Sequence, residues 1–172
     1  MAHTELFYNI DESVGKGKQN EASDVLLVKF FLKEIAEASK TRPNEALGQP
    51  FVPPAAPLPL DGTPSEDFFL WIKTYQEIKK KSSWVSFAPD GIVSPVPPDN
   101  VQATRQVPGT NRYETRDRYT LYALNLEYKN FFPKSWADLA HEPKAPGVLC
   151  NELRDRLGFD SRVASGVGLG VV

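Results

Sequence analysis

The fold is decided by residues 23–38, which read SDVLLVKFFLKEIAEA. The apolar side chains in this stretch recur at the spacing of one helix face, a pattern that predicts an amphipathic helix. Ser23 is a good N-cap, and the helix is expected to run to about Ala38. Its apolar stripe comprises Val25, Leu27, Val28, Phe31, Leu32 and Ile35. A stripe of this width needs a partner surface elsewhere in the chain.

A second helix is expected to follow Ser65, whose hydroxyl can cap it. Its broad aromatic face comprises Phe68, Phe69, Trp71, Ile72, Tyr75 and Ile78. We expect the run Lys79-Lys80-Lys81 to close this helix as a cap and a solvated end, because cations complement the negative end of the helix dipole. The two stripes together predict one core that buries Val25, Val28, Leu32, Phe68, Ile72 and Tyr75.

The second half of the chain contains further helical patterns. Residues 112–130 fit the period of a strand as well as that of a helix, and the surrounding good helix formers favour a helix. Residues 135–139 resemble a short, capped helical turn. A last helix is predicted from Pro146 to Leu157, ended by Gly158, with Val148, Leu149, Leu153 and Leu157 facing inward.

Two segments outside the helices are candidates for contacts with a partner. Residues 41–64 carry many of the chain's 15 prolines, which exclude a helix and predict an extended surface loop. This proline-rich strap is expected to be a stiff connection laid over the domain, and a docking strap is the alternative. Residues 163–172 form an apolar, glycine-rich tail, which is expected to pack either on its own domain or on a neighbouring subunit.

Composition limits the class of protein. The net charge of −2 disfavours nucleic-acid binding, and the 41% of hydrophobic residues can build a core. We therefore expect a single domain over residues 1–172. The single cysteine, Cys150, cannot form an intramolecular disulfide and is expected to be a buried thiol. The N-terminus has no secretory pattern and no apolar run is long enough to span a bilayer, so we expect cytoplasmic synthesis without a signal peptide and no membrane insertion.

Four short motifs follow one another in the first half of the chain: Ser13-Val14-Gly15, Asp61-Gly62, Tyr75-Gln76 and Asp90-Gly91-Ile92-Val93. Their order resembles the peptidoglycan-binding-like three-helix domain found in cell-wall hydrolases, phage-tail proteins and secretion-machine components. The resemblance covers roughly residues 13–95. It implies a mainly α fold with a peptidoglycan-binding-like three-helix core over residues 13–130, long proline-rich loops, and a C-terminal helical extension over residues 131–172.

The resemblance also implies where a ligand would bind, near the second Asp-Gly loop and the aromatic helix. Aromatic faces can pack on sugar rings while amide and carboxylate groups fix orientation. The candidate ligand-binding residues are Trp71, Tyr75, Gln76, Trp84, Asp90 and Gly91. A structural reading of the same residues is also open, in which the Asp-Gly pairs are ordinary turns, Tyr75 is a core aromatic and Gln76 bonds to a loop.

Enzyme chemistry has little support in the sequence. His3 and His141 are the two histidines, and neither belongs to a zinc-binding pattern. No Gly-x-Ser-x-Gly nucleophile elbow is present. We therefore expect a protein that is not an enzyme and that uses no metal and no cofactor.

The expected function is that of a non-catalytic structural or adaptor component of a larger assembly, of the phage-tail or injection-machine type. Its partners would be other protein subunits, and it would be incorporated into a virion or an exported particle. The alternative is a peptidoglycan-binding module that recognises the bacterial cell wall. Absence of a secretion signal favours the first hypothesis, because a wall-binding protein made by its host needs export.

Overall fold

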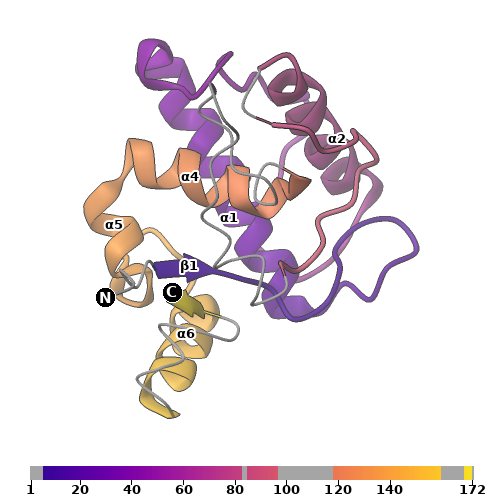
Figure 1. Cartoon of the computed structure of the whole chain (residues 1–172). Coiled ribbons are helices and arrows are strands. Elements are labelled where there is room, and N and C mark those ends of the chain that lie inside the picture. The colour runs from indigo at the N-terminus through magenta and orange to yellow at the C-terminus, as the bar shows by residue number, and fades with distance from the viewer. Residues whose placement is uncertain (1–5, 83–84, 97–117, 160–168, 172) are drawn as a thin grey trace.

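The structure, a computed structural model, describes residues 6–82, 85–96, 118–159 and 169–171. The described part of the chain is mainly helical (Figure 1). Its elements in chain order are β1 (Leu6–Tyr8), α1 (Ala22–Thr41), the 3-10 helix η1 (Pro43–Glu45), α2 (Glu66–Lys80), α4 (Thr120–Phe131), α5 (Pro133–Ala137), the 3-10 helix η3 (Leu139–His141), α6 (Gly147–Phe159) and β2 (Leu169–Val171). The expectation of a mainly α fold is confirmed at this level.

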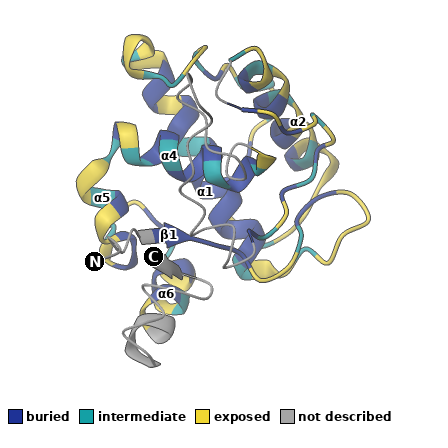
Figure 2. Ribbon diagram, in the orientation of Figure 1, coloured by how far each residue is buried: buried dark blue, intermediate teal, exposed yellow. Residues whose placement is uncertain are grey.

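Helix α1 is the centre of the molecule and packs against α2, α4 and α6 (Figure 1). Most of the length of α1 is buried (Figure 2), as expected for a helix in which further apolar residues widen the apolar stripe on both sides. The predicted core is confirmed, because one cluster buries Val25, Val28, Leu32, Phe68, Ile72 and Tyr75.

Helix α1 begins before the residue that was expected to cap it. The Val25 N–H donates to the Glu21 carbonyl at 2.9 Å, which makes Glu21 the N-cap and places Ser23 inside the first turn. The prediction of Ser23 as the cap was therefore wrong. The next residue, Asp24, is buried, and its carboxylate accepts hydrogen bonds from the backbone N–H groups of Asp11 and Glu12. This carboxylate fixes the loop that precedes the helix.

Helix α2 begins where the sequence predicted. The Ser65 hydroxyl accepts a hydrogen bond from the Phe68 N–H at 3.1 Å. The end of the helix differs from the prediction, because only Lys80 and Lys81 are exposed, whereas Lys79 is buried. Lys79 lies on the inner face of the helix, where it forms an ion pair with Glu127 of α4. It is therefore not part of a solvated end.

The predicted C-terminal helices are present with shifted boundaries. Helix α4 confirms the helical interpretation from Thr120 onward, while residues 112–117 lie outside the described part. In α6, Leu149 and Leu153 are buried as expected, but Val148 is 71% exposed and its inward orientation was wrongly predicted. Position 148 lies in the first turn, where period alone does not determine whether a neighbouring element covers it. The Leu157 side chain is outside the description. Cys150 is a buried free thiol, as expected.

The described structure places the proline-rich strap over its own domain. Phe51 and Leu58 insert into the core. The Lys33 ammonium donates to the Leu58 carbonyl at 3.3 Å, and the Trp71 indole N–H donates to the Ala56 carbonyl at 2.8 Å. The strap is thus an internal connection, as preferred from the sequence.

The two ends of the described chain meet. Strands β1 and β2 pair in antiparallel orientation, with Leu6 opposite Val171, Phe7 opposite Gly170 and Tyr8 opposite Leu169. The sequence did not predict β1. Of the apolar tail, residues 163–168 and 172 lie outside the described part, and Leu169–Val171 pairs with β1 of the same chain.

Candidate functional site

The side chain of Gln76 joins α2 to the second Asp-Gly loop and to α4. Its amide nitrogen donates to the Ile92 carbonyl at 3.0 Å, to the Thr120 hydroxyl at 2.9 Å and, more weakly, to Asp90 Oδ1 at 3.3 Å. Its amide oxygen accepts the Gly91 N–H at 2.7 Å. Gln76 has no exposed surface, so both ends of the amide are used inside the protein. We call these contacts the Gln76 network.

The loop at the other side of the network is a tight turn. Asp90 Oδ1 accepts the Ile92 N–H at 2.9 Å, an Asx-type contact that is typical of aspartate in turns. Gly91 has φ = 75°, a left-handed conformation that favours glycine. The Asp90-Gly91 pair therefore supplies the turn that presents backbone groups to Gln76.

The first and last motifs lie against each other. Val14 and Val93 form an isolated antiparallel bridge, with N–H to carbonyl distances of 2.9 and 2.8 Å. Gly15, at φ = 146°, lies so close to this loop that a Cβ would be 2.8 Å from the Gly91 carbonyl oxygen. A side chain at position 15 would separate the two loops, so glycine is required by the close backbone approach.

The remaining motif, Asp61-Gly62, is attached to the beginning of the core helix. The buried Lys29 ammonium contacts Asp61 Oδ1 at 2.8 Å and the Thr63 carbonyl at 2.6 Å. Its hydrogen bond to Asp61 is the main reason that the pKa of this carboxyl lies below its ordinary value. Gly62 faces Ala22, leaving no room for a side chain. All four motifs therefore carry internal contacts in the fold.

A second buried polar group lies further along α2. Lys79 and Glu127 form an ion pair, and neither side chain has exposed surface. The Lys79 ammonium also donates to the carbonyls of Leu47 at 3.0 Å and Gln49 at 2.7 Å. The three oxygen acceptors around Lys79 match the three N–H donors of an ammonium group. The group ties α2, α4 and the strap together.

Burial is the largest influence on the titration of this group. It lowers the pKa of Lys79 and raises that of Glu127, while the opposite charge of each partner counteracts the change. Burial and the Glu127 carboxylate both raise the pKa of the Tyr75 phenol well above its ordinary value. Tyr75 therefore stays protonated beside the carboxylate.

A pocket of about 120 Å³ opens beside the Gln76 network. Its walls carry one anionic and one cationic side chain, Asp90 and Arg118, both exposed. The hydroxyls of Ser94 and Thr120 add polar groups that can hydrogen-bond a ligand. The complete lining is Phe87, Ala88, Asp90, Ile92, Ser94, Arg118, Tyr119 and Thr120. This mixture suits a small polar group and offers little apolar surface.

The candidate ligand-binding residues are distributed unevenly around this pocket. Of the six, Asp90 lines it. Gln76 and Gly91 lie behind it, where they hold the turn. The structural reading of Gln76 as a residue that bonds to a loop is confirmed.

The aromatic candidates do not offer a free face to a sugar. Trp71 is 6% exposed and Tyr75 is fully buried, because both pack edge-on against Phe51 of the strap. Both rings therefore lack the free face on which the expected stacking on a glycan depends. Trp84 lies outside the described residues.

The sequence patterns did not indicate several residues of the site. Arg118 and Tyr119 line the pocket, and Thr120 bonds to Gln76 from a position 44 residues away. Glu127 is the buried partner of Lys79 at a separation of 48 residues. No local pattern marks such contacts, since each depends on how α4 packs against α2.

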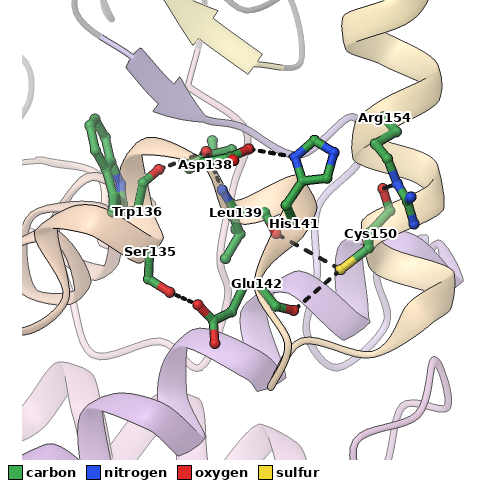
Figure 3. A network of polar contacts seen from close by, with 9 residues as sticks. Ser135, Trp136, Asp138, Leu139, His141, Glu142, Cys150 and Arg154 are labelled. Carbon is green, nitrogen blue, oxygen red and sulfur yellow. Dashed lines mark hydrogen bonds and ion pairs between the residues drawn. The ribbon is translucent and has the colours of Figure 1, made fainter.

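The polar groups around η3 are shown in Figure 3. The exposed His141 ring contacts Asp138 Oδ1 at 2.7 Å through Nδ1. The Cys150 thiol is directed toward the backbone carbonyls of Leu139 and Glu142, at 3.8 and 3.7 Å (Figure 3). The thiol is buried, and these contacts join α6 to the backbone around η3. This cluster therefore reads as a structural connection between η3 and α6.

The described residues lack two kinds of feature. They contain no group of three or more histidine, cysteine, aspartate or glutamate side chains placed to hold a metal ion. None of the described helices combines the length and the apolar character that crossing a bilayer requires. No protein-family model, no curated protein and no solved structure matches this chain.

Proposed function

We propose that the protein is a non-catalytic structural or adaptor component of a larger assembly, of the phage-tail or injection-machine type, built on a peptidoglycan-binding-like fold. The observation that carries the proposal is the use of Gln76. All the hydrogen bonds described above for the Gln76 amide are made within the protein. They join two of the four motifs that carry the resemblance. These residues make a scaffold, and the outer surface is left for contacts with other subunits.

Three of the four motifs support the resemblance through their mutual contacts. Val14 pairs with Val93, Gly15 lies against Gly91, and Gln76 bonds to the same loop. A fold signature requires that segments far apart in sequence hold one another in space, and these contacts are consistent with that requirement.

The assembly function can be tested by fractionation of native particles. The tagged full-length chain is produced in its native cells, and the lysate is separated on a density gradient. We expect the protein to sediment with a particle and to be present in a fixed ratio to the other subunits, as measured by mass spectrometry. Sedimentation of the folded protein only at the position of a free monomer or small oligomer contradicts the proposal.

Wall binding is retained as a second candidate because of the pocket beside Asp90. Asp90 and Arg118 present charges of both signs, and peptidoglycan carries carboxylates and amines on its peptides. The test is co-sedimentation with purified peptidoglycan sacculi. If the wall is the ligand, Arg118→Ala lowers the bound fraction, whereas Lys80→Ala, which removes an exposed charge from the end of α2, does not. A folded wild-type protein that stays in the supernatant excludes wall binding.

A further inference from the structure

We infer that β1 is the acceptor for the C-terminal strand of a second copy of this chain, so that Leu169–Val171 is exchanged between neighbouring subunits. This inference rests on the proposed function, because it supplies the contact through which an assembly would grow. The contact would reproduce in trans the pairing that β1 and β2 make within one chain.

Strand β1 is held in place on the edge opposite to β2. The Tyr8 N–H donates to Asn125 Oδ1 at 2.9 Å, and the Asn125 amide nitrogen donates to the Tyr8 carbonyl at 2.9 Å. The side chain of Asn125 thus replaces a neighbouring strand. Since the backbone groups of Tyr8 are used on this side, alternation along the strand directs those of Phe7 toward Gly170. One edge of β1 is closed, and the other accepts a strand.

Further anchors hold β1 independently of β2. The Tyr8 hydroxyl donates to the Trp136 carbonyl at 2.7 Å and accepts the Leu139 N–H at 3.1 Å. The Asn9 side chain bonds to both the N–H and the carbonyl of Val96. Tyr8 and Phe7 are buried in the core. The acceptor strand is therefore fixed by α4, α5 and η3 whichever chain provides its partner.

The donor strand, β2, is held on β1 by few backbone contacts. Only three residue pairs form the ladder, and its central residue is Gly170, which has no side chain to pack. An isolated two-stranded ladder is at best marginally stable in water. Exchange of such a strand costs little, because the same hydrogen bonds are formed again on the neighbour.

The chain itself indicates which strand would pair with β1 of a neighbour and how far that strand can extend from its own domain. A second copy carries the same Leu169–Val171 segment and fits in the same register, which a foreign strand has no reason to do. Residues 160–168 join Phe159, the last residue of α6, to the donor strand, and a segment of this length can span up to about 30 Å. A neighbour whose β1 lies within that distance can be reached. A single dilute chain instead closes on itself, because its own strand has the higher effective concentration.

The test uses a disulfide that can form only in trans. Leu6→Cys and Val171→Cys are placed on separate full-length chains in a Cys150→Ala background, and the chains are mixed and oxidised. Positions 6 and 171 form a pair without mutual backbone hydrogen bonds, in which the two Cα atoms are closest. A mixture of Lys80→Cys and Val171→Cys chains measures collision alone. Circular dichroism confirms that each variant is folded.

With exchange, the Leu6→Cys and Val171→Cys mixture forms roughly tenfold more disulfide-linked heterodimer than the control mixture, rising with concentration. A chain carrying both cysteines closes within itself when dilute and links to other chains when concentrated. If the double variant closes within itself but the mixture forms no more heterodimer than the control, the exchange is wrong. If the double variant fails to close, the pairing itself is wrong. Either result leaves the gradient test of the proposed assembly function intact, so the two failures are distinguishable.

Discussion

Lys79 and Glu127 hold each other in the interior as a charged pair, with no solvent on either side chain. Replacing Lys79 by methionine leaves Glu127 without its counter-charge and leaves two carbonyls of the strap without a donor. We expect Lys79→Met to lower the free energy of unfolding by about 3–5 kcal/mol, measured by urea denaturation. Lys80→Met, at the exposed neighbouring position, is the control and should be close to neutral.

A double variant separates the charge from the packing. Lys79→Met combined with Glu127→Leu removes both charges, so no uncompensated ion is buried. The double variant should therefore be more stable than Lys79→Met alone. If it is as unstable as the single variant or less stable, the loss comes from packing and the ion pair is not the cause.

The Gln76 network predicts that replacing Gln76 lowers the stability of the fold. Gln76→Leu keeps an apolar body but leaves the Gly91 N–H and the Ile92 carbonyl without their partner. Each buried group left unpaired costs about 1–3 kcal/mol, so a total loss of about 2 kcal/mol or more is expected in thermal or urea unfolding. Glu77→Gln, on the exposed side of the same helix, is the matched control. A Gln76→Leu variant as stable as this control contradicts the role given to the network.

Two glycines with opposite surroundings give a paired test. A Cβ at position 62 would be 2.7 Å from the Cβ of Ala22, so Gly62→Ala forces the turn away from α1 and should cost about 1–3 kcal/mol. Gly147 begins α6 and has open space around it, so Gly147→Ala should stabilise by about 0.4–1 kcal/mol. Equal effects of the two substitutions on the melting temperature would show that the space around them does not matter.

Glu34 on α1 predicts a specific dependence on pH. Partial burial is the largest influence and raises the pKa of this carboxyl; Glu142 and Glu37 act in the same direction, while Lys144 and Lys33 oppose it. Because the folded pKa lies above the unfolded one, the stabilising contribution of Glu34 is present at low pH and is lost as pH rises through the folded pKa. Glu34→Gln should therefore gain stability relative to wild type between about pH 4 and pH 7. Glu37→Gln, at an exposed position, should show a smaller change, and a difference of opposite sign rules out the burial argument.

The core substitution Leu32→Ala tests the packing of α1. Leu32 is 1% exposed and lies in the same cluster as Phe68 and Ile72. The cavity left by the truncation should cost about 2–5 kcal/mol in urea denaturation. A loss below that of an exposed truncation such as Leu70→Ala contradicts the central position of this side chain.

Local signals predicted the elements whose causes are local. The cap at Ser65 and the burial of Leu32 follow from hydrogen bonding and periodicity within one helix, and the structure confirms both. The buried Lys79 was missed because lysines at a helix end are usually solvated, and only the packing of α4 places Glu127 opposite it. Val148 was misassigned for a related reason, since a period tells which side chains share a face but not what covers that face.

The candidate site was predicted only in outline. The region near the second Asp-Gly loop was expected to bind a ligand, and the pocket lies there, lined by Asp90. The aromatic residues were expected to face that ligand because large rings are common in sugar sites. Phe51 of the strap covers Trp71 and Tyr75 instead, and the sequence does not show which way a proline-rich segment crosses the domain.

The anchoring of β1 sets an order on folding during synthesis. The partners of Tyr8 lie 117 residues later at Asn125 and 128 residues later at Trp136. The ribosome adds about 5–20 residues per second, so the N-terminal strand has no docking surface for several seconds after it is made. During that time its apolar side chains are exposed, and they are open to chaperones or to wrong partners. Helices α1 and α2 can meet while synthesis continues, whereas β1, which is made before both of them, is among the last elements to reach its place.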